Sequence, residues 1–185
     1  MADLRQAMLT TIMIAQMDMS DFLLPMGISE GRFDAGYVKK VMSDAYFDKS
    51  LPKSLDRNDF APPEPGSLSL SDGARSLARI TALAIIKGVE QLPAPPAMWI
   101  ICGGGRFNAA IMHDLAELAG EQGSSVAAAE KFGLDGSSME AEAFAYLAVR
   151  SMRGLPLTFP MTTGCRSPAT GGVLVRTEQA HERSA

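Results

Sequence analysis

An uninterrupted apolar run that ends in three consecutive glycines limits the fold of this chain more than any other feature. The run covers residues 98–102 and includes β-branched side chains, which is typical of a strand buried on both faces. It leads directly into Gly103, Gly104 and Gly105, and Asn108 then stands where a helix cap belongs. Glycines between a strand and a helix let a ligand approach bare backbone beside the positive end of a helix. A tight turn alone would also need glycine, so the local pattern leaves both interpretations open.

The segments after this turn predict the α/β fold class. Apolar residues at helical spacing predict a helix over residues 108–120, and a weaker apolar run predicts a second strand at 126–129. Two strands joined by a helix form a βαβ unit, whose strands are parallel. The glycines therefore lie at the carboxyl end of a strand, where ligands bind in open α/β sheets.

Helices are also predicted on both sides of this unit. Upstream, one helix is expected from Asp34 to about residue 47, and a longer one from residue 71 or 72 to a stop between residues 88 and 93. The proline-rich residues 51–67 between them predict an extended connection.

Downstream, a final long helix is expected from Ser137, which forms a capping-box pattern with Glu140, to Gly154. Because this helix is apolar on several sides, we expect it to be buried among neighbours. A last short strand is predicted at residues 173–175.

Composition narrows the classes of function. A net charge of −4 and a pI near 5.2 give no basic surface for nucleic acid, and 185 residues favour a single folded unit. Charged and polar residues interrupt the apolar stretch at residues 9–24, so no membrane span is expected. The two cysteines lie far apart and have no histidine at zinc-ligand spacing, so we expect no metal site, no disulfide and a cytoplasmic location.

Several residue groups offer alternatives. Gly103 and Gly105 before a helix, with Glu130 after the second strand, permit an NAD-type dinucleotide site, although Asn108 stands at the third glycine position. Lys53 could bind an anionic group, but charges in a proline-rich connection are more often solvated. His113 is expected on the surface, and no residue set resembles a catalytic triad. We therefore assign no catalytic residue.

Four segments, taken together, resemble the anhydro-N-acetylmuramic acid kinases. They are WIICGGGRFN at residues 99–108, MEAEAFAYLA at 139–148, LP at 155–156 and PMTTG at 160–164, in that order. A weaker upstream likeness, to a Pro-Lys-Ser-Thr-Gly-Arg-Glu segment, begins at Pro52. As a set, these motifs are specific.

The resemblance implies a fold, a reaction and a binding site. The fold would be the C-terminal ribonuclease H-like lobe of an actin-like ATPase or sugar kinase. The reaction would be phosphorylation of 1,6-anhydro-N-acetylmuramic acid to N-acetylmuramic acid 6-phosphate during cell-wall recycling, with ATP and Mg²⁺. The glycine turn of this lobe contacts adenosine, so Gly103, Gly104, Gly105 and Asn108 would bind the nucleotide, with Arg106 at the rim stacking on the base.

The chain also departs from that family. It lacks the glycine- and serine-rich phosphate loop, the aspartate base and the Asp-Thr-Gly-Pro-Gly segment. We expect an atypical segment at residues 1–31, an incomplete kinase lobe at 32–176 and a polar tail at 177–185. Such a lobe would be inactive alone. It could instead act as a non-catalytic interaction module that forms a homo-oligomer or pairs with a separately encoded N-terminal half.

Overall fold

The computed structural model describes residues 31–50, 53, 63–64 and 66–175. The atypical segment predicted at residues 1–31, the connection predicted at 51–67 and the polar tail at 177–185 lie wholly or mostly outside these residues. The fold divides into two compact units, residues 1–140 and 141–185. Whether residues 32–176 form one folded lobe stays a prediction, and each unit is described by itself.

The first unit begins with helix α2, Ala35–Met42, which is capped as predicted by Asp34. The Asp34 carboxylate accepts a hydrogen bond from the Tyr37 N–H at 2.6 Å. The helix ends at Met42 instead of continuing to residue 47, and a 3₁₀ turn, η4, follows at Ala45–Asp48. Asp44 causes the break, because its side chain accepts from the Tyr46 N–H and starts a new turn.

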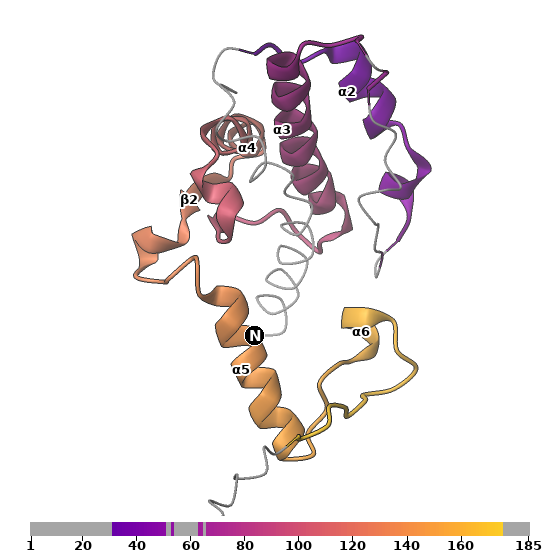
Figure 1. The fold of residues 1–185 in the computed structure, drawn as a ribbon, viewed down its shortest axis with the longest axis vertical. Coiled ribbons are helices and arrows are strands. Elements are labelled where there is room, and N and C mark those ends of the chain that lie inside the picture. The colour runs from indigo at the N-terminus through magenta and orange to yellow at the C-terminus, as the bar shows by residue number, and fades with distance from the viewer. Residues whose placement is uncertain (1–30, 51–52, 54–62, 65, 176–185) are drawn as a thin grey trace, which may run out of the picture. The chain divides into compact units, whose positions relative to one another are not determined.

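Helix α3, Leu70–Lys87, lies between α2 and α4, Ala109–Glu121 (Figure 1). Its cap is Ser69, so the helix begins slightly before the predicted start, and it ends at the predicted Gly88. It is followed by a 3₁₀ turn, η6, at Gly88–Gln91. Alanine and isoleucine side chains of α3 are buried toward both neighbouring helices.

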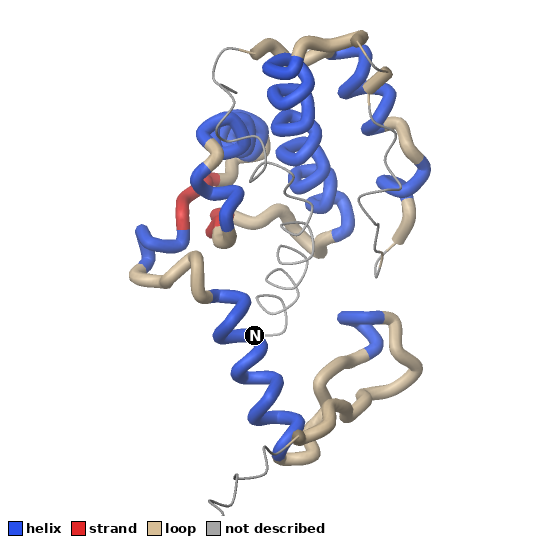
Figure 2. Tube along the Cα trace, in the orientation of Figure 1, coloured by secondary structure: helices blue, strands red, loops and turns tan. Residues whose placement is uncertain are grey.

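The βαβ unit is confirmed. Strand β1, Met98–Ile101, pairs in parallel with β2, Ser125–Ala128, in a register that places Met98 opposite Ser125, and α4 joins them. These are the only strands among the described residues (red in Figure 2). Burial of β1 on both faces was wrong: Ile101 is buried, but Met98 and Ile100 are 45% and 40% exposed. Ile101 and Trp99 pack against the core and alternate with these exposed side chains, so the described residues cover only one face of β1.

The main core lies between α3, α4 and β1. It is built from aliphatic side chains that are at most 8% exposed, namely Ala78, Ala82, Ile86, Ile101, Ile111, Leu115, Leu118 and Ala119. Because α4 contributes half of these residues, its N-terminus and the turn before it are anchored to the best-packed part of the unit.

The second unit contains most of helix α5, Met139–Met152, and the short helix α6, Pro160–Thr163. Its loop returns to α5 through two hydrogen bonds, from Arg150 Nε to the Pro156 carbonyl at 2.7 Å and from Ser151 Oγ to the Gly171 carbonyl at 2.6 Å. Gly154 ends the helix with a positive φ, as predicted. The strand predicted at residues 173–175 does not form.

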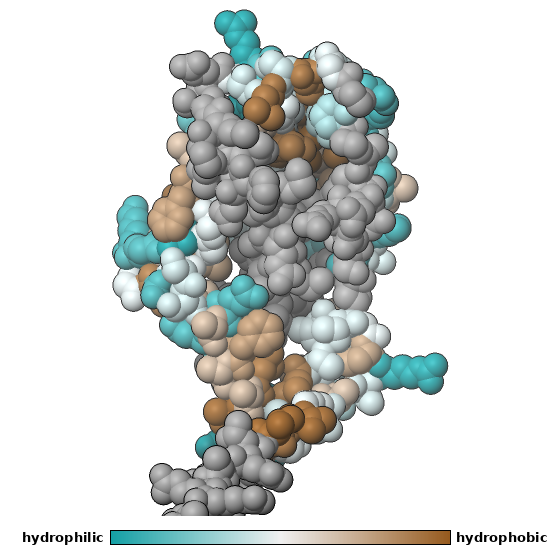
Figure 3. All heavy atoms as spheres, viewed as in Figure 1, coloured by the Kyte–Doolittle hydropathy of each residue, from teal (hydrophilic) through white to brown (hydrophobic). Residues whose placement is uncertain are grey.

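Burial of α5 was also wrong for the described residues. No α5 side chain is buried, and four large apolar side chains are 46–71% exposed: Phe144, Tyr146, Val149 and Met152. Figure 3 shows the apolar colour gathered over this unit. Among the described residues, none of the helices combines the length and the apolar character that crossing a bilayer would require.

Candidate nucleotide-binding turn

The three glycines after β1 have different structural roles. Gly103 has φ 77° and ψ 177°, a backbone conformation that is essentially restricted to glycine. Gly104 and Gly105 open a 3₁₀ turn, η7, at Gly104–Phe107, and neither has a positive φ. Only Gly103 is therefore required by backbone conformation. Glycine at positions 104 and 105 is not required by backbone conformation, which is compatible with the ligand-approach interpretation.

Asn108 links this turn to helix α4. Its side chain is 2% exposed, and Oδ1 accepts hydrogen bonds from the N–H groups of Ala110 at 3.0 Å and Ile111 at 3.2 Å. This confirms the predicted N-cap. The Nδ2 group is buried and has no hydrogen-bond partner among the described residues. An unsatisfied buried donor is costly, and a ligand oxygen would satisfy it.

A second buried donor without a partner in the described part of the chain is the indole N–H of Trp99. Trp99 lies on β1 and packs against the aliphatic core. Asn108, in contrast, sits at the helix start directly after the glycines. Only the Asn108 donor therefore coincides with the features that favour an anionic or sugar ligand.

Arg106 does not lie at the rim of the site. Its side chain is 3% exposed, and each guanidinium nitrogen has an acceptor. Nε donates to Glu130 Oε1 at 2.8 Å, Nη2 donates to the Ser137 hydroxyl at 2.7 Å, and Nη1 donates to the Gly103 carbonyl. The expectation that Arg106 stacks on a base is wrong in this structure, because the guanidinium group is buried and held by these three hydrogen bonds.

Glu130 follows β2 in a 3₁₀ turn, η8, Ala129–Phe132, where the dinucleotide alternative places a ribose-binding acid. Its carboxylate is paired with Arg106. The hydrogen bond from Arg106 is the largest cause that lowers the pKa of this carboxyl group. Arg106 engages only Oε1 and the Glu130 side chain is 49% exposed, so this pairing does not by itself exclude an NAD-type site.

The capping box predicted at Ser137 and Glu140 is also wrong. Helix α5 begins at Met139, and the Ser137 hydroxyl accepts from Arg106. Asp135 organises this turn instead: it accepts from the Ser137 N–H at 2.9 Å and the Ser138 hydroxyl at 2.6 Å. These bonds lower the pKa of Asp135, the Ser138 bond being the larger cause. Ser137 is thus available to the arginine because another residue holds the turn.

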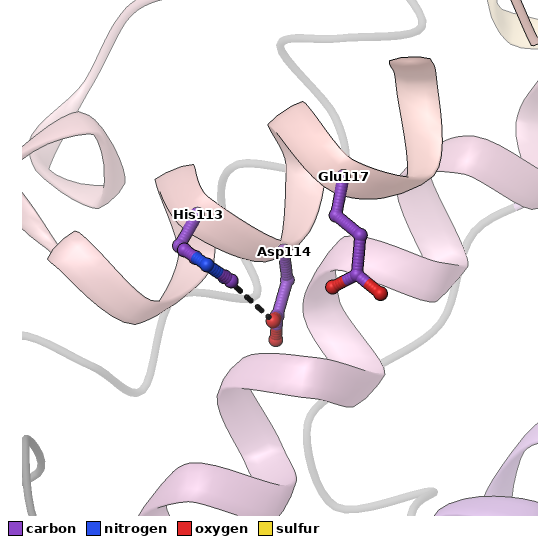
Figure 4. A group of neighbouring side chains, drawn as sticks. All are labelled: His113, Asp114 and Glu117. Atoms are coloured by element: carbon purple, nitrogen blue, oxygen red, sulfur yellow. Dashed lines mark ion pairs between the residues drawn. The ribbon is translucent and has the colours of Figure 1, made fainter. Parts of the chain in front are cut away.

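Helix α4 carries the only group of metal-ligand type found among the described residues: His113, Asp114 and Glu117 (Figure 4). Asp114 is completely buried, and its two oxygens accept from Arg75 at 2.6 and 2.7 Å. Arg79 lies 3.2 Å from the same carboxylate. With its oxygens engaged by two guanidinium groups, Asp114 joins α3 to α4 and does not fit a metal ligand. His113 is 74% exposed, as predicted.

Lys53 is the described residue of the upstream Pro-Lys-Ser segment. Its ammonium group donates to the carbonyls of Tyr46 and Phe47 at 3.1 and 2.9 Å, and it lies 4.9 Å from the centre of the Tyr46 ring. Burial is the largest cause that lowers its pKa. The Lys53 ammonium group therefore caps the end of η4 and is not simply solvated. The structure gives it no contact with the glycine turn among the described residues.

Two long-range ion pairs were missed by the sequence analysis: the buried Asp114 with Arg75 and Arg79, and the buried Arg106 with the half-exposed Glu130. Arg75 and Arg79 are four residues apart, a spacing that puts both cations on one face of a helix. It does not identify their partner, because Asp114 lies 35 or more residues away in sequence. Arg106 and Glu130 were both noted, each for a ligand role. No local signal relates such partners, because tertiary packing brings them together.

Most of the chain is similar in sequence to one family of known proteins. The model of the family "Anhydro-N-acetylmuramic acid kinase" matches residues 27–177. Proteins of that name are 53% identical over 146 residues in Agrobacterium fabrum, 51% over 144 in Rhizobium johnstonii and 49% over 146 in Brucella canis. The aligned region covers 78–79% of this chain but 39% of each of these relatives. The chain thus spans about two fifths of their length.

Proposed function

This chain belongs to the anhydro-N-acetylmuramic acid kinase family, and we propose that it forms the adenosine-binding side of an ATP-dependent sugar-kinase site. The proposed reaction of the whole site is phosphorylation of 1,6-anhydro-N-acetylmuramic acid to N-acetylmuramic acid 6-phosphate, a cytoplasmic step of cell-wall recycling. The described part of the chain would be one ribonuclease H-like lobe of the actin-like fold.

The buried, unpartnered Nδ2 group of Asn108 is the observation that carries this proposal. Asn108 ends the turn that Gly104 and Gly105 open, and the N–H groups of these two glycines have no acceptor among the described residues. Ribose hydroxyls and phosphate oxygens are acceptors that both kinds of donor can bind. These donors support the proposal that ATP binds at this turn. When bound, ATP with Mg²⁺ supplies the phosphoryl group, and this chain's residues bind and orient the nucleoside end.

Asn108→Asp tests the nucleotide site with little change in shape. The carboxylate keeps an oxygen that accepts from Ala110 and Ile111, so the helix cap is retained, whereas the Nδ2 donor is lost. We expect ADP affinity to fall and the unfolding midpoint to fall as well, because the new carboxylate is buried, so affinity is compared at a temperature where both proteins are folded. Calorimetry or NMR titration measures the first and thermal denaturation the second. Tight binding of NAD without binding of ADP would contradict the proposal.

The same proposal predicts the catalytic behaviour of a protein of these 185 residues alone. Its sequence offers no candidate base and no phosphate loop, and general-base help alone is worth about 10²–10⁴ in rate. Given ATP, Mg²⁺ and the anhydro sugar, it should release no phosphorylated sugar above background. Clear turnover by the purified chain would show that the sequence contains a base and phosphate-binding groups that we have not recognised.

A second function, an interaction module, is favoured by the exposed apolar residues of α5. Phe144 and Met152 are 63% and 71% exposed, which is unusual for large apolar side chains on one helix. We commit to one partner: a polypeptide equivalent to the part of the relatives that this chain does not match, about three fifths of their length. Mixing the two should give a heterodimer in gel filtration and restore phosphorylation. A homo-oligomer that excludes the added polypeptide would contradict this.

A further inference from the structure

Arg106 connects three segments that are distant in sequence. Its guanidinium group binds the Gly103 carbonyl, the Glu130 carboxylate after β2 and the Ser137 hydroxyl before α5. This uses all three guanidinium nitrogens in a side chain that is almost fully buried. Such a network restricts the guanidinium to one position.

The same network holds the residue whose conformation the turn requires. The Gly103 carbonyl accepts from Arg106, and the Gly103 N–H donates to the Gly136 carbonyl at 2.9 Å. The Gly103 N–H is thus bonded directly to the segment that leads into α5, and its carbonyl is linked to that segment through Arg106 and Ser137. This residue sets the direction of the backbone immediately before Gly104 and Gly105.

Gly136 packs directly against this network. A Cβ atom at this position would lie 2.7 Å from Arg106 Nε, closer than real Cβ atoms approach, and 3.0 Å from Glu130 Oε1, which is a tight contact. Gly136 itself does not have a positive φ, so its requirement for glycine comes from space rather than backbone conformation. The Arg106–Glu130 pair is thus closely packed against the backbone of Gly136.

We propose that Arg106, with Glu130, is a positioning residue for nucleotide binding, which fixes Gly103 so that the N–H groups of Gly104 and Gly105 and the Asn108 amide face one ligand. This rests on the proposed nucleotide site. Arg106 does not contact the nucleotide in this account. Its role is to preorganise groups that do, and loss of such orienting partners commonly weakens binding about 10-fold or more.

The test is NMR titration of the full chain with ADP, for the unaltered protein and for Arg106→Gln, Arg106→Lys and Glu130→Gln. We expect Arg106→Gln to weaken ADP binding about tenfold. Arg106→Lys should rescue little, because one ammonium group cannot reach three separated acceptors. Glu130→Gln should weaken binding less than Arg106→Gln, because its amide oxygen can still accept from Arg106 Nε.

Arg79→Gln is the matched control. It removes one cation from the buried Asp114 pair in the same unit, and the contacts of Arg79 in the described part of the chain are with Asp114, Glu117 and Phe33, outside the turn. Arg79→Gln should lower stability and leave ADP affinity unchanged. If Arg106 had only a structural role, Arg106→Gln would show this same pattern. Hydrogen exchange adds an independent readout: the Gly103 amide, bonded to Gly136, should lose protection in Arg106→Gln but not in Arg79→Gln.

The outcomes separate this inference from the function on which it rests. If the unaltered chain shows no ADP-dependent shifts at residues 103–108, the nucleotide site is wrong and the inference with it. If the unaltered chain binds ADP and folded Arg106→Gln binds it equally well, the site stands and the positioning role is wrong. If Arg106→Gln does not fold, unchanged affinity in Glu130→Gln overturns the role and weaker affinity supports it.

Discussion

Helices α4 and α5 have nearly the same length, 13 and 14 residues, and both are rich in apolar side chains. In α4, Ile111 and Leu115 are buried against α3 and β1. In α5, no side chain is buried. The sequence pattern predicted burial among neighbours for α5 in particular, so the difference comes from the segments available to pack against each helix. A helix that carries a site needs such neighbours, and among the described residues α4 has them.

The largest expected effect comes from removing the buried charge of α4. Asp114→Ala leaves Arg75 and Arg79 without their shared partner inside a packed contact, which should lower the free energy of unfolding by about 4 kcal/mol. Urea denaturation measures the change. Glu117→Gln, which removes an exposed partner of Arg79, is the control and should cost less than about 1 kcal/mol. Equal effects would mean that the Asp114 pair is not buried in solution.

Truncation of one apolar side chain in each helix tests the comparison directly. Leu115→Ala removes a completely buried side chain and should cost about 3 kcal/mol. Phe144→Ala removes a side chain that is 63% exposed and should change stability by less than about 0.5 kcal/mol. A large loss in Phe144→Ala would show that α5 is covered in solution by another segment or another molecule.

The glycine turn provides a smaller contrast between neighbouring positions. Gly103→Ala places a side chain at φ 77°, ψ 177°, which should cost about 1–3 kcal/mol in thermal or chemical unfolding. Gly104→Val has no such backbone penalty, so it should harm ADP binding more than stability. Unfolding of Gly104→Val by several kcal/mol would favour a purely structural turn.

The smallest expected effect is a response to acid confined to the Arg106 side of the turn. The folded state lowers the pKa of Glu130, mainly through the hydrogen bond from Arg106. Its contribution to stability is therefore fully present above the pKa of the unfolded chain and is lost as pH falls through the lower folded pKa. NMR titration should show acid-induced shifts at Gly103 and Ser137, and Arg106→Gln should raise the pKa of Glu130. An unchanged pKa in that variant would contradict the pairing.

Local sequence patterns correctly predicted the elements that depend on neighbouring residues. The strand before the glycines, the Asn108 cap, the parallel βαβ connection and the end of α5 at Gly154 all follow from local preferences, which act over a few residues. The family relationship was also readable, because ordered motifs at the right spacing are specific.

Tertiary structure alone decided burial and long-range pairing. Arg106 was predicted at a ligand and Glu130 at a ribose, yet the fold brings the two together across 24 residues. Asp114 reaches Arg75 across 39 residues. Burial of α5 depends on which segments pack against it, and no property of the helix alone supplies them. Charge pairing and burial are relations between distant parts of a chain, whereas capping and turn formation are properties of a few adjacent residues.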